Sequence, residues 1–272
     1  MKIILSRKGI DSGNVDIASP ILPDGTLLSI PIPTDDNTGM SYADIQYQEK
    51  SFEDILRSLN RGRDLKLAYH NIHLDPDIRK SIYIKPPEAW VPAFGTRSGD
   101  EAAVRPMTIA QPEDIFLFFG RFRHVDEGFR FSSPELHCIW GYMQVGQVIT
   151  DRKEIEQYHW HPHSKSNRLL NERYNTLYIP SPFLSWDPLV PGSGTLKFHE
   201  ECQLTLPGKT RALWRKQPFY MPEKVTNAKR KNSDQTGLGL YYSGFWQELV
   251  LEEDEVATEW AKTVILSCGT GH

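Results

Sequence analysis

The sequence is poor in cysteine and has no long apolar run. Its three cysteines, Cys138, Cys202 and Cys268, are odd in number and share no CxxC spacing, which argues against a disulfide framework. We expect them to be inert thiols. No stretch approaches the roughly eighteen apolar residues that cross a membrane, and the first apolar run, Ile3–Leu5, is too short for the core of a secretory signal. These absences predict a cytoplasmic protein with no membrane partner.

The chain also lacks the basic excess that is typical of nucleic-acid-binding domains. It has 272 residues and a formal net charge of −4, with 39% hydrophobic and 24% charged residues. Such a composition can bury a substantial core. No internal repeat, low-complexity tract or linker divides the chain, so we expect a single domain over residues 1–272.

One stretch, residues 209–231, is locally basic and carries only one acid, Glu223. Its basic residues are Lys209, Arg211, Arg215, Lys216, Lys224, Lys229, Arg230 and Lys231, with the aromatic residues Trp214, Phe219 and Tyr220 between them. Phosphate contacts and stacking rings are what single-stranded nucleic acid needs. The alternative is a solvated loop whose aromatic residues belong to the core.

Three segments have the pattern of helices. Residues 51–60 begin with a sequence that resembles a capping box, and Phe52, Ile55, Leu56 and Leu59 recur at helical spacing. A short helix is expected from Asp151 through Tyr158. A closing helix is expected from Glu252 to Leu266, and its predicted inward residues are Val256, Trp260, Val264 and Ile265.

Three other segments are typical of strands. The runs 115–119 and 136–149 are apolar, aromatic and β-branched, which predicts a strand pair joined by a polar turn. Residues 238–251 predict one further strand. Nineteen prolines and nineteen glycines indicate long irregular connections. Together these patterns predict an α+β protein with a mixed or antiparallel twisted sheet, a few peripheral helices and long Pro/Gly-rich loops.

The first candidate site follows the opening strand. Arg7 and Asp11 lie on a glycine turn, Ser6-Arg7-Lys8-Gly9-Ile10-Asp11, directly after Ile3-Ile4-Leu5. An arginine fork and a carboxylate held on such a turn can bind an anion and a hydroxyl group. We therefore expect an anion-binding element at the start of the fold.

A second candidate site combines an imidazole with two carboxylates. His73, Asp75 and Asp77 alternate around a proline turn. They could bind a divalent metal or orient a sugar hydroxyl. The alternative is structural, because Asp-Pro-Asp is also a good turn and helix N-cap.

A third candidate site contains histidines at alternate positions, His159, His161 and His163. On one face of a strand they could meet a zinc ion. Pro162 disfavours a strand interior, and no cysteine or carboxylate stands near in sequence as a fourth ligand. Phosphate contact or a histidine turn is therefore preferred.

A fourth candidate is Glu248, which opens the apolar triplet Leu249–Leu251. A carboxylate held beside a pocket by buried neighbours can bind a ribose hydroxyl and stabilise an oxocarbenium-like transition state. The alternative is that Glu248 caps an exposed strand position.

With these motifs in view, the chain resembles the nucleotide-modification-associated domain family of the third type. The motifs that carry the resemblance are Ser6-Arg7-Lys8-Gly9 with Asp11, Ser19-Pro20-Ile21, Asp24-Gly25, Pro31-Ile32-Pro33, His73-Leu74-Asp75-Pro76-Asp77, residues 114–120, residues 137–146, His161-Pro162-His163 and Trp246-Gln247-Glu248. The resemblance implies enzymatic modification of nucleic-acid bases. Where the family has a Gln- and Ala-rich stretch after Phe-Gly, this chain has Thr96-Arg97-Ser98-Gly99-Asp100-Glu101 after Phe94-Gly95, so the substrate could differ if that stretch binds it.

Two wider similarities are looser. The strand pair with Phe118, Phe119 and Trp140 looks like the sheet of PUA-like domains, which bind RNA or modified bases. Arg7 and Glu248 are similar to the arginine and the catalytic glutamate of ADP-ribosyltransferases. No Ser-Thr-Ser element stands between them, and Gln247 is adjacent to the glutamate rather than two residues before it.

The leading hypothesis is a nucleic-acid-modifying transferase, most economically one that uses NAD to ADP-ribosylate a base in DNA or RNA, as a toxin or defence effector held by an inhibitory protein. Ser6, Arg7, Gly9 and Asp24 would bind NAD. Glu248 would stabilise the ribosyl cation, and Asp11 or His73 would orient the ribose or deprotonate the base. The residues assigned to nucleic acid are Asp75, Asp77, His161, His163, Lys209, Arg211, Arg215, Lys216 and Trp214; no metal ligand is assigned.

Two hypotheses from other classes remain open. One is a non-catalytic PUA-like reader of nucleic acid. The other is a metal-dependent nuclease or hydrolase that uses His73, Asp75, Asp77 and the histidine triplet.

Overall fold

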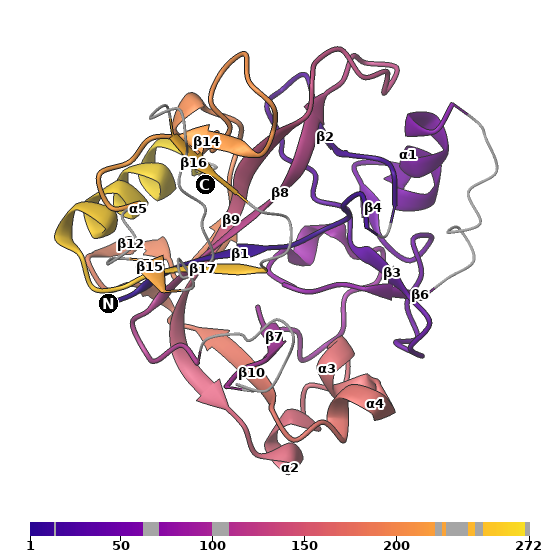
Figure 1. Cartoon of the computed structure of the whole chain (residues 1–272). Coiled ribbons are helices and arrows are strands. Elements are labelled where there is room, and N and C mark those ends of the chain that lie inside the picture. The colour runs from indigo at the N-terminus through magenta and orange to yellow at the C-terminus, as the bar shows by residue number, and fades with distance from the viewer. Residues whose placement is uncertain are drawn as a thin grey trace.

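The structure is a computed structural model that describes residues 1–13, 15–61, 71–99, 109–220, 225–226, 239–242 and 247–269. A mixed, curled sheet runs through the middle of the molecule (Figure 1). Its main path is β15 (Val225–Thr226), β17 (Glu248–Leu251), β1 (Ile3–Arg7), β8 (Ile115–His124), β9 (Leu136–Ile149), β10 (Asn175–Pro180) and β7 (Phe94–Arg97), with β2 (Ser19–Ile21) on β8 and β13 (Ser193–Thr195) on β9. Only the pairings of β8 with β1 and β2 are parallel among these strands. The predicted α+β class is confirmed.

The long strands β8 and β9 form the centre of the core. Residues 115–122 of β8 are buried without interruption, as expected for a central strand that is covered on both faces. The two strands pair antiparallel from Ile115 opposite Gln144 to Phe122 opposite Leu136, with a register shift between Phe118 and Phe119. The predicted strand pair is therefore confirmed.

Helix α1 (Phe52–Leu59) belongs to a second hydrophobic cluster. The Ser51 side chain caps it by accepting a hydrogen bond from the Asp54 N–H, and the four apolar residues predicted to face inward are buried. The short elements around it are β3 (Ile32–Thr34), β4 (Gln46–Tyr47), β5 (Lys50–Ser51), β6 (Asn71–His73) and η2 (Lys80–Ile82). They lie to the right of the sheet in Figure 1. The predicted single domain is not tested by these clusters and stays a prediction.

Helix α5 (Glu255–Cys268) packs against the core of the main sheet. Asp254 caps it, so the helix begins three residues later than predicted. Val264 and Ile265 are buried as predicted, but Val256 is 52% exposed, because Ala257 and Ala261 face the core instead. Small residues allow the helix to approach the core closely, and this rotates its buried face away from Val256.

Three short helices connect β9 to β10. They are α2 (Arg152–Ile155), α3 (Pro162–Lys165) and α4 (Asn167–Leu170). Asp151 is the N-cap of α2, as expected, and the helix ends three residues before Tyr158, where its end was predicted. His161 and Ser166 are the N-caps of α3 and α4.

The predicted strand over residues 238–251 is wrong as a single element. β16 (Gly239–Tyr241) pairs with β14 (Leu213–Arg215), whereas β17 pairs with β1 and β15 in the main sheet. The segment thus contributes to two different sheets, and residues 243–246 lie outside the described part. An apolar pattern indicates a strand but does not tell which partner the strand pairs with.

The remaining described elements lie over β9. They are β11 (Phe183–Leu184), β12 (Asp187–Pro191) and η3 (Glu200–Cys202).

The three cysteines are buried and form no disulfide, and the thiols of Cys138 and Cys268 interact with that of Cys202. Burial raises the pKa of Cys138, which keeps this thiol protonated. No helix in the described ranges is long and apolar enough to cross a membrane.

Candidate active site

The strand register sorts the side chains at the end of β1 onto two faces of the sheet. Ser6 lies opposite Glu248 in β17 and opposite Phe118 in β8. Side chains of directly opposed residues lie on the same face, and those of consecutive residues alternate. Glu248 and Ser6 therefore share one face, and Arg7 points to the other.

Lys8 is the basic residue of the Glu248 face. Its side chain is buried, and its Nζ lies 4.4 Å from the centroid of the Phe94 ring. Burial lowers the pKa of Lys8, and the nearby carboxylates of Asp75 and Glu248 oppose this effect. An amine whose pKa is lowered by burial can act as a base or a nucleophile near neutral pH. Lys8 was not assigned a role from the sequence.

Glu248 is only 2% exposed, so it does not cap an exposed strand position. Its charge acts on Lys8 and on Tyr178 of β10. The Tyr178 hydroxyl lies 2.8 Å from Ser98 Oγ and accepts a hydrogen bond from the Ala110 N–H at 3.1 Å. Burial raises the pKa of Tyr178 to about 12, so this hydroxyl stays protonated.

Asp75 lies at the centre of a histidine cluster. Its carboxylate is 3.5 Å from His73 Nε2, 3.3 Å from His161 Nε2 and 3.7 Å from His163 Nε2. Burial raises the pKa of Asp75, but the imidazoles of His161 and His73 outweigh it and hold the pKa well below its usual range. Gly95 also donates its N–H to Asp75 Oδ1 at 2.8 Å. The carboxylate thus remains ionised in spite of its burial.

His161 and His163 lie in a turn, which is the arrangement preferred from the sequence over one face of a strand. The segment forms a capped turn of helix rather than a strand, and the carboxylate that the local sequence lacks comes from Asp75. His161 and His163 join His73 at this carboxylate. His159 is exposed and its Nδ1 lies 3.3 Å from the Gln157 carbonyl oxygen, away from the cluster.

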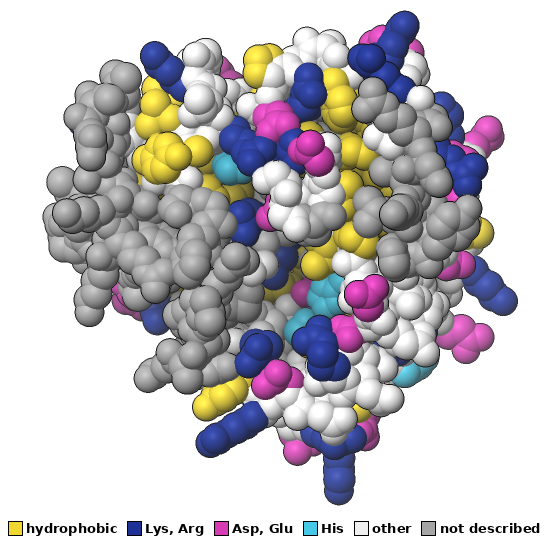
Figure 2. All heavy atoms as spheres, turned by 45° about the vertical axis from the view of Figure 1, so that its right-hand side comes forward, with side chains coloured by type: hydrophobic (Ala, Val, Ile, Leu, Met, Phe, Trp, Pro, Cys, Tyr) yellow, Lys and Arg dark blue, Asp and Glu magenta, His cyan; other side chains and the backbone are white. Residues whose placement is uncertain are grey.

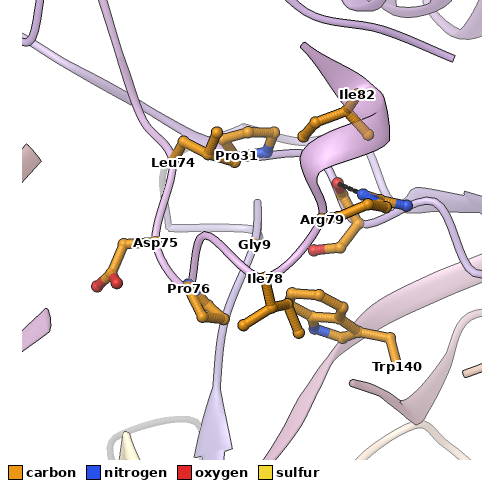
Figure 3. Close-up of a pocket in the computed structure, with 10 residues that line it drawn as sticks. Gly9, Pro31, Leu74, Asp75, Pro76, Ile78, Arg79, Ile82 and Trp140 are labelled. Atoms are coloured by element: carbon orange, nitrogen blue, oxygen red, sulfur yellow. Dashed lines mark hydrogen bonds between the residues drawn. The ribbon is translucent and has the colours of Figure 1, made fainter. Parts of the chain in front are cut away.

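Asp77 is separated from this cluster by its hydrogen bonds. Its Oδ2 accepts from the Tyr83 hydroxyl and from Trp90 Nε1–H, 2.9 Å away. Burial raises the pKa of Asp77 to about 7. Asp77 therefore holds the Tyr83 and Trp90 side chains, and its predicted contact with substrate stays a prediction. Figure 3 shows the pocket beside this loop, with the Asp75 carboxylate turned away from Arg79 and Ile82.

Arg7 and Asp11 form the predicted arginine and carboxylate pair, with 3.5 Å between Arg7 Nη1 and Asp11 Oδ2. The backbone N–H of Arg7 donates to the Gln247 carbonyl at 2.8 Å, so the chain at Arg7 does lie beside that at Glu248. The alternation of the strand nevertheless turns the two side chains to opposite faces. Burial lowers the pKa of His137 to about 3, and the charges of Arg211 and Arg7 lower it further. The charge of Arg7 also lowers the pKa of the adjacent Lys8.

The other residues of the predicted cofactor site are Ser6, Gly9 and Asp24. Gly9 has φ +86°, and a Cβ at this position would lie 2.7 Å from Ser29 Oγ, so the turn requires glycine. Ser6 Oγ is buried and makes no hydrogen bond within the described ranges. Asp24 lies in a distant turn, where it accepts from Thr26 and pairs with Lys197 at 3.6 Å. This turn follows β2, which pairs with β8 at Phe122–His124, beyond the residues Ile115–Phe119 that pair with β1; the assignment of Asp24 to the Arg7 site stays a prediction.

Trp214 is a core residue and not a stacking platform for bases. Its side chain is fully buried, stacks on Tyr242 with 4.5 Å between ring centroids, and donates from Nε1 to His137 Nδ1 at 3.0 Å. Arg211 pairs with Glu135 and donates to Ser12. The other described residues of the basic stretch are the exposed Lys209 and Lys216 and the half-buried Arg215; Lys224 and residues 229–231 lie outside the described part.

One face of the molecule is hollowed, and histidine side chains lie in this hollow beside acidic and basic ones (Figure 2).

The sequence did not indicate two of the residues that organise the site, Gly95 and Asn175. Asn175 accepts from His163 Nδ1 at 2.6 Å, and a Cβ on Gly95 would overlap the His163 ring, with 2.3 Å to its Cδ2. A glycine between bulky strand residues is a signal of close approach.

A buried lysine, two buried carboxylates and a group of histidines on a mixed sheet define a candidate acid–base site in an α+β protein. Over residues 2–252 the chain matches the family model described as nucleotide modification associated domain 3, so it belongs to that family. The match ends before α5 and confirms the resemblance noted from the sequence. Comparisons with curated proteins and with solved structures gave no match.

Proposed function

We propose that the protein is an enzyme that modifies a base in nucleic acid, and that its reaction centre is the set Lys8, Asp75 and Glu248. The family is named for nucleotide modification, which supports the substrate class. The observation that carries the proposal is that the side chain of Lys8 is buried beside the histidine cluster. The charges of two carboxylates, Asp75 and Glu248, act on its pKa. Titratable groups with shifted pKa values concentrate at functional sites.

The proposed reaction is a group transfer to a nitrogen of the base. The neutral amine of Lys8 accepts the proton that this nitrogen loses as it forms its bond to the incoming group, and the two carboxylates stabilise the resulting ammonium. The second substrate is a donor of an activated group; as the bond to the nitrogen forms, the bond between this group and the rest of the donor breaks, and the leaving group departs with the electron pair of that bond. Base catalysis by a positioned side chain typically contributes about 10²–10⁴-fold to a rate.

ADP-ribosylation with NAD as the donor is the narrower form of this proposal. Glu248 would then stabilise the ribosyl cation that forms as the bond to nicotinamide breaks. Its position on a buried strand supports this role. The opposite orientation of Arg7 weighs against it, because Arg7 was expected to hold the NAD phosphates from the same side.

The proposal is tested by mass spectrometry of nucleosides. Purified protein is incubated with single-stranded DNA, duplex DNA or RNA, together with NAD or a small-molecule extract of cells, and the nucleic acid is digested. We expect the wild type to produce a nucleoside of increased mass. The amount of this product should fall by at least about 100-fold in Lys8→Met and in Glu248→Gln. Lys153→Met, at an exposed position of α2, is the matched control and retains the product.

Three outcomes separate the remaining hypotheses. A product that appears only with NAD supports ADP-ribosylation. No new nucleoside on any nucleic acid, with binding that survives Lys8→Met and Glu248→Gln, supports the PUA-like reader and contradicts the enzyme. Growth arrest on expression of the wild type, absent in Lys8→Met, supports a toxin that requires an inhibitory partner.

A further inference from the structure

The hydrogen bonds of His163 fix which of its nitrogens carries a proton. Asn175 donates from Nδ2 to the His163 carbonyl at 3.0 Å, so its Oδ1 is the atom that faces the ring. His163 Nδ1 must therefore donate the 2.6 Å hydrogen bond to Asn175 Oδ1. In the neutral ring this leaves a lone pair on Nε2. His163 Nε2 is thus an acceptor.

The second acceptor is Oδ2 of Asp75. Oδ1 of this carboxylate is occupied by the Gly95 N–H at 2.8 Å. Oδ2 faces His73 Nε2 at 3.5 Å and His163 Nε2 at 3.7 Å. Both distances exceed those of an N–H···O hydrogen bond. The His163 lone pair and a lone pair of the carboxylate oxygen therefore face each other in a buried site, an arrangement that a cation between them would stabilise.

We propose that His73 Nε2, Asp75 Oδ2 and His163 Nε2 bind one divalent transition-metal ion. The ligand atoms of these three residues lie within 4.8 Å of one another. Two atoms that share an ion at about 2.1 Å lie about 3.0–3.4 Å apart, so the two histidine–carboxylate pairs, at 3.5 and 3.7 Å, need movements of only a few tenths of an ångström to reach this spacing. Two imidazoles and one carboxylate suit first-row transition metals rather than Mg²⁺ or Ca²⁺, and three ligands leave positions open for substrate or water.

His161 orients this centre and is not one of its ligands. Its Nδ1 accepts the His163 backbone N–H at 3.3 Å, so in the neutral ring the proton is on Nε2. That fully buried Nε2 faces Asp75 Oδ1 at 3.3 Å and makes no hydrogen bond to any described residue. A small shift would turn this 3.3 Å contact into a hydrogen bond to the oxygen of Asp75 that does not ligate the ion, and such a bond holds a ligating carboxylate in position. His161 is therefore a positioning residue.

The test measures binding and does not depend on the proposed reaction. Protein freed of metal by a chelator is titrated with Co²⁺, whose visible absorption reports its coordination, and the stoichiometry is measured by calorimetry. We expect one Co²⁺ per chain and no measurable binding to His73→Gln, Asp75→Asn or His163→Gln. His161→Asn retains an N-cap acceptor and loses about 10–100-fold in affinity. His159→Gln, in the same segment but exposed, binds as the wild type.

Two results would overturn the proposal. One is a wild type that binds no Co²⁺; the other is a site abolished by His161→Asn but retained in His163→Gln. Far-ultraviolet circular dichroism checks the fold of every variant. If the buried His163 cannot be replaced, His73→Gln decides, because the His73 side chain is 16% exposed at the edge of the cluster. A wild type that binds Co²⁺ but modifies no base would contradict the proposed function and leave the metal site standing.

Discussion

Two buried histidines on opposite sides of the sheet both have a strongly lowered pKa, but their surroundings differ. Burial lowers the pKa of both His137 and His163 to about 3. His137 Nδ1 accepts a hydrogen bond from Trp214, and aromatic rings pack around the imidazole. His163 Nε2 faces the carboxylate of Asp75. A shifted pKa therefore does not distinguish a structural histidine from a functional one; the atom that faces its lone pair does.

The largest expected effect separates Asp75 from its neighbour Asp77. Asp75→Asn keeps an oxygen for the Gly95 N–H but removes the charge that faces Lys8 and the histidines. We expect the modified nucleoside to fall by about 10³-fold. Asp77→Asn retains an acceptor for Tyr83 and Trp90, and its product should stay within a few-fold of the wild type. Equal losses in the two variants, measured by nucleoside mass spectrometry, would remove the distinction.

The next effect concerns stability on the His137 face. Trp214→Ala removes a fully buried ring and the donor to His137, and should lower the free energy of unfolding by about 3–5 kcal/mol. Urea denaturation measures this loss. Co²⁺ affinity of the folded variant should not change, because Trp214 lies across the sheet from the histidine cluster. A variant of normal stability with weakened Co²⁺ binding would contradict the assignment of the two faces.

The two histidines also predict a pH dependence of stability. Their pKa is about 3 in the folded protein and 6.5 when unperturbed, so between these values the unfolded chain binds a proton that the folded chain excludes. Stability is therefore lost as the pH falls from about 6.5 toward 3, by about 1.4 kcal/mol per pH unit for each histidine. His137→Gln and His163→Gln should each flatten this slope in urea titrations. Added Co²⁺ should stabilise the wild type and His137→Gln but not His163→Gln.

The smallest expected effect is on nucleic-acid affinity. Lys209 and Lys216 are exposed, and replacing either with alanine should weaken binding a few-fold for all sequences and reduce the salt slope by about one. Binding measured at several salt concentrations tests this. If neither variant changes the slope, the described part of the basic stretch is a solvated loop.

The sequence was sufficient for local structure wherever the pattern was periodic and the partners were near. The cap and buried face of α1 and the pairing of β8 with β9 are such cases. It failed where tertiary packing decides. Val256 fits an apolar pattern but is exposed, because small alanines face the core. The apolar pattern of residues 238–251 predicts one strand, but the first part of the segment pairs with β14 and the last part pairs with β1 in the main sheet.

The same limit applies to the candidate site. His73, Asp75, His161 and His163 could each be named from local motifs, but no local pattern brings residues 73–75 to residues 161–163. Lys8 was visible only as part of the Arg7 turn, although alternation after β1 places it with Ser6. The register of β17, which decides that Glu248 faces Lys8 and not Arg7, depends on a pairing across the whole chain.

The most direct test compares Lys8→Met with Arg7→Met in the nucleoside mass-spectrometry assay. Both variants remove one positive charge from adjacent residues of the same turn, but on opposite faces of the sheet. We predict that Lys8→Met loses the modified nucleoside by at least about 100-fold, whereas Arg7→Met retains it within a few-fold. Loss of product in Arg7→Met with normal product in Lys8→Met would contradict the account and place the reaction on the Arg7 face.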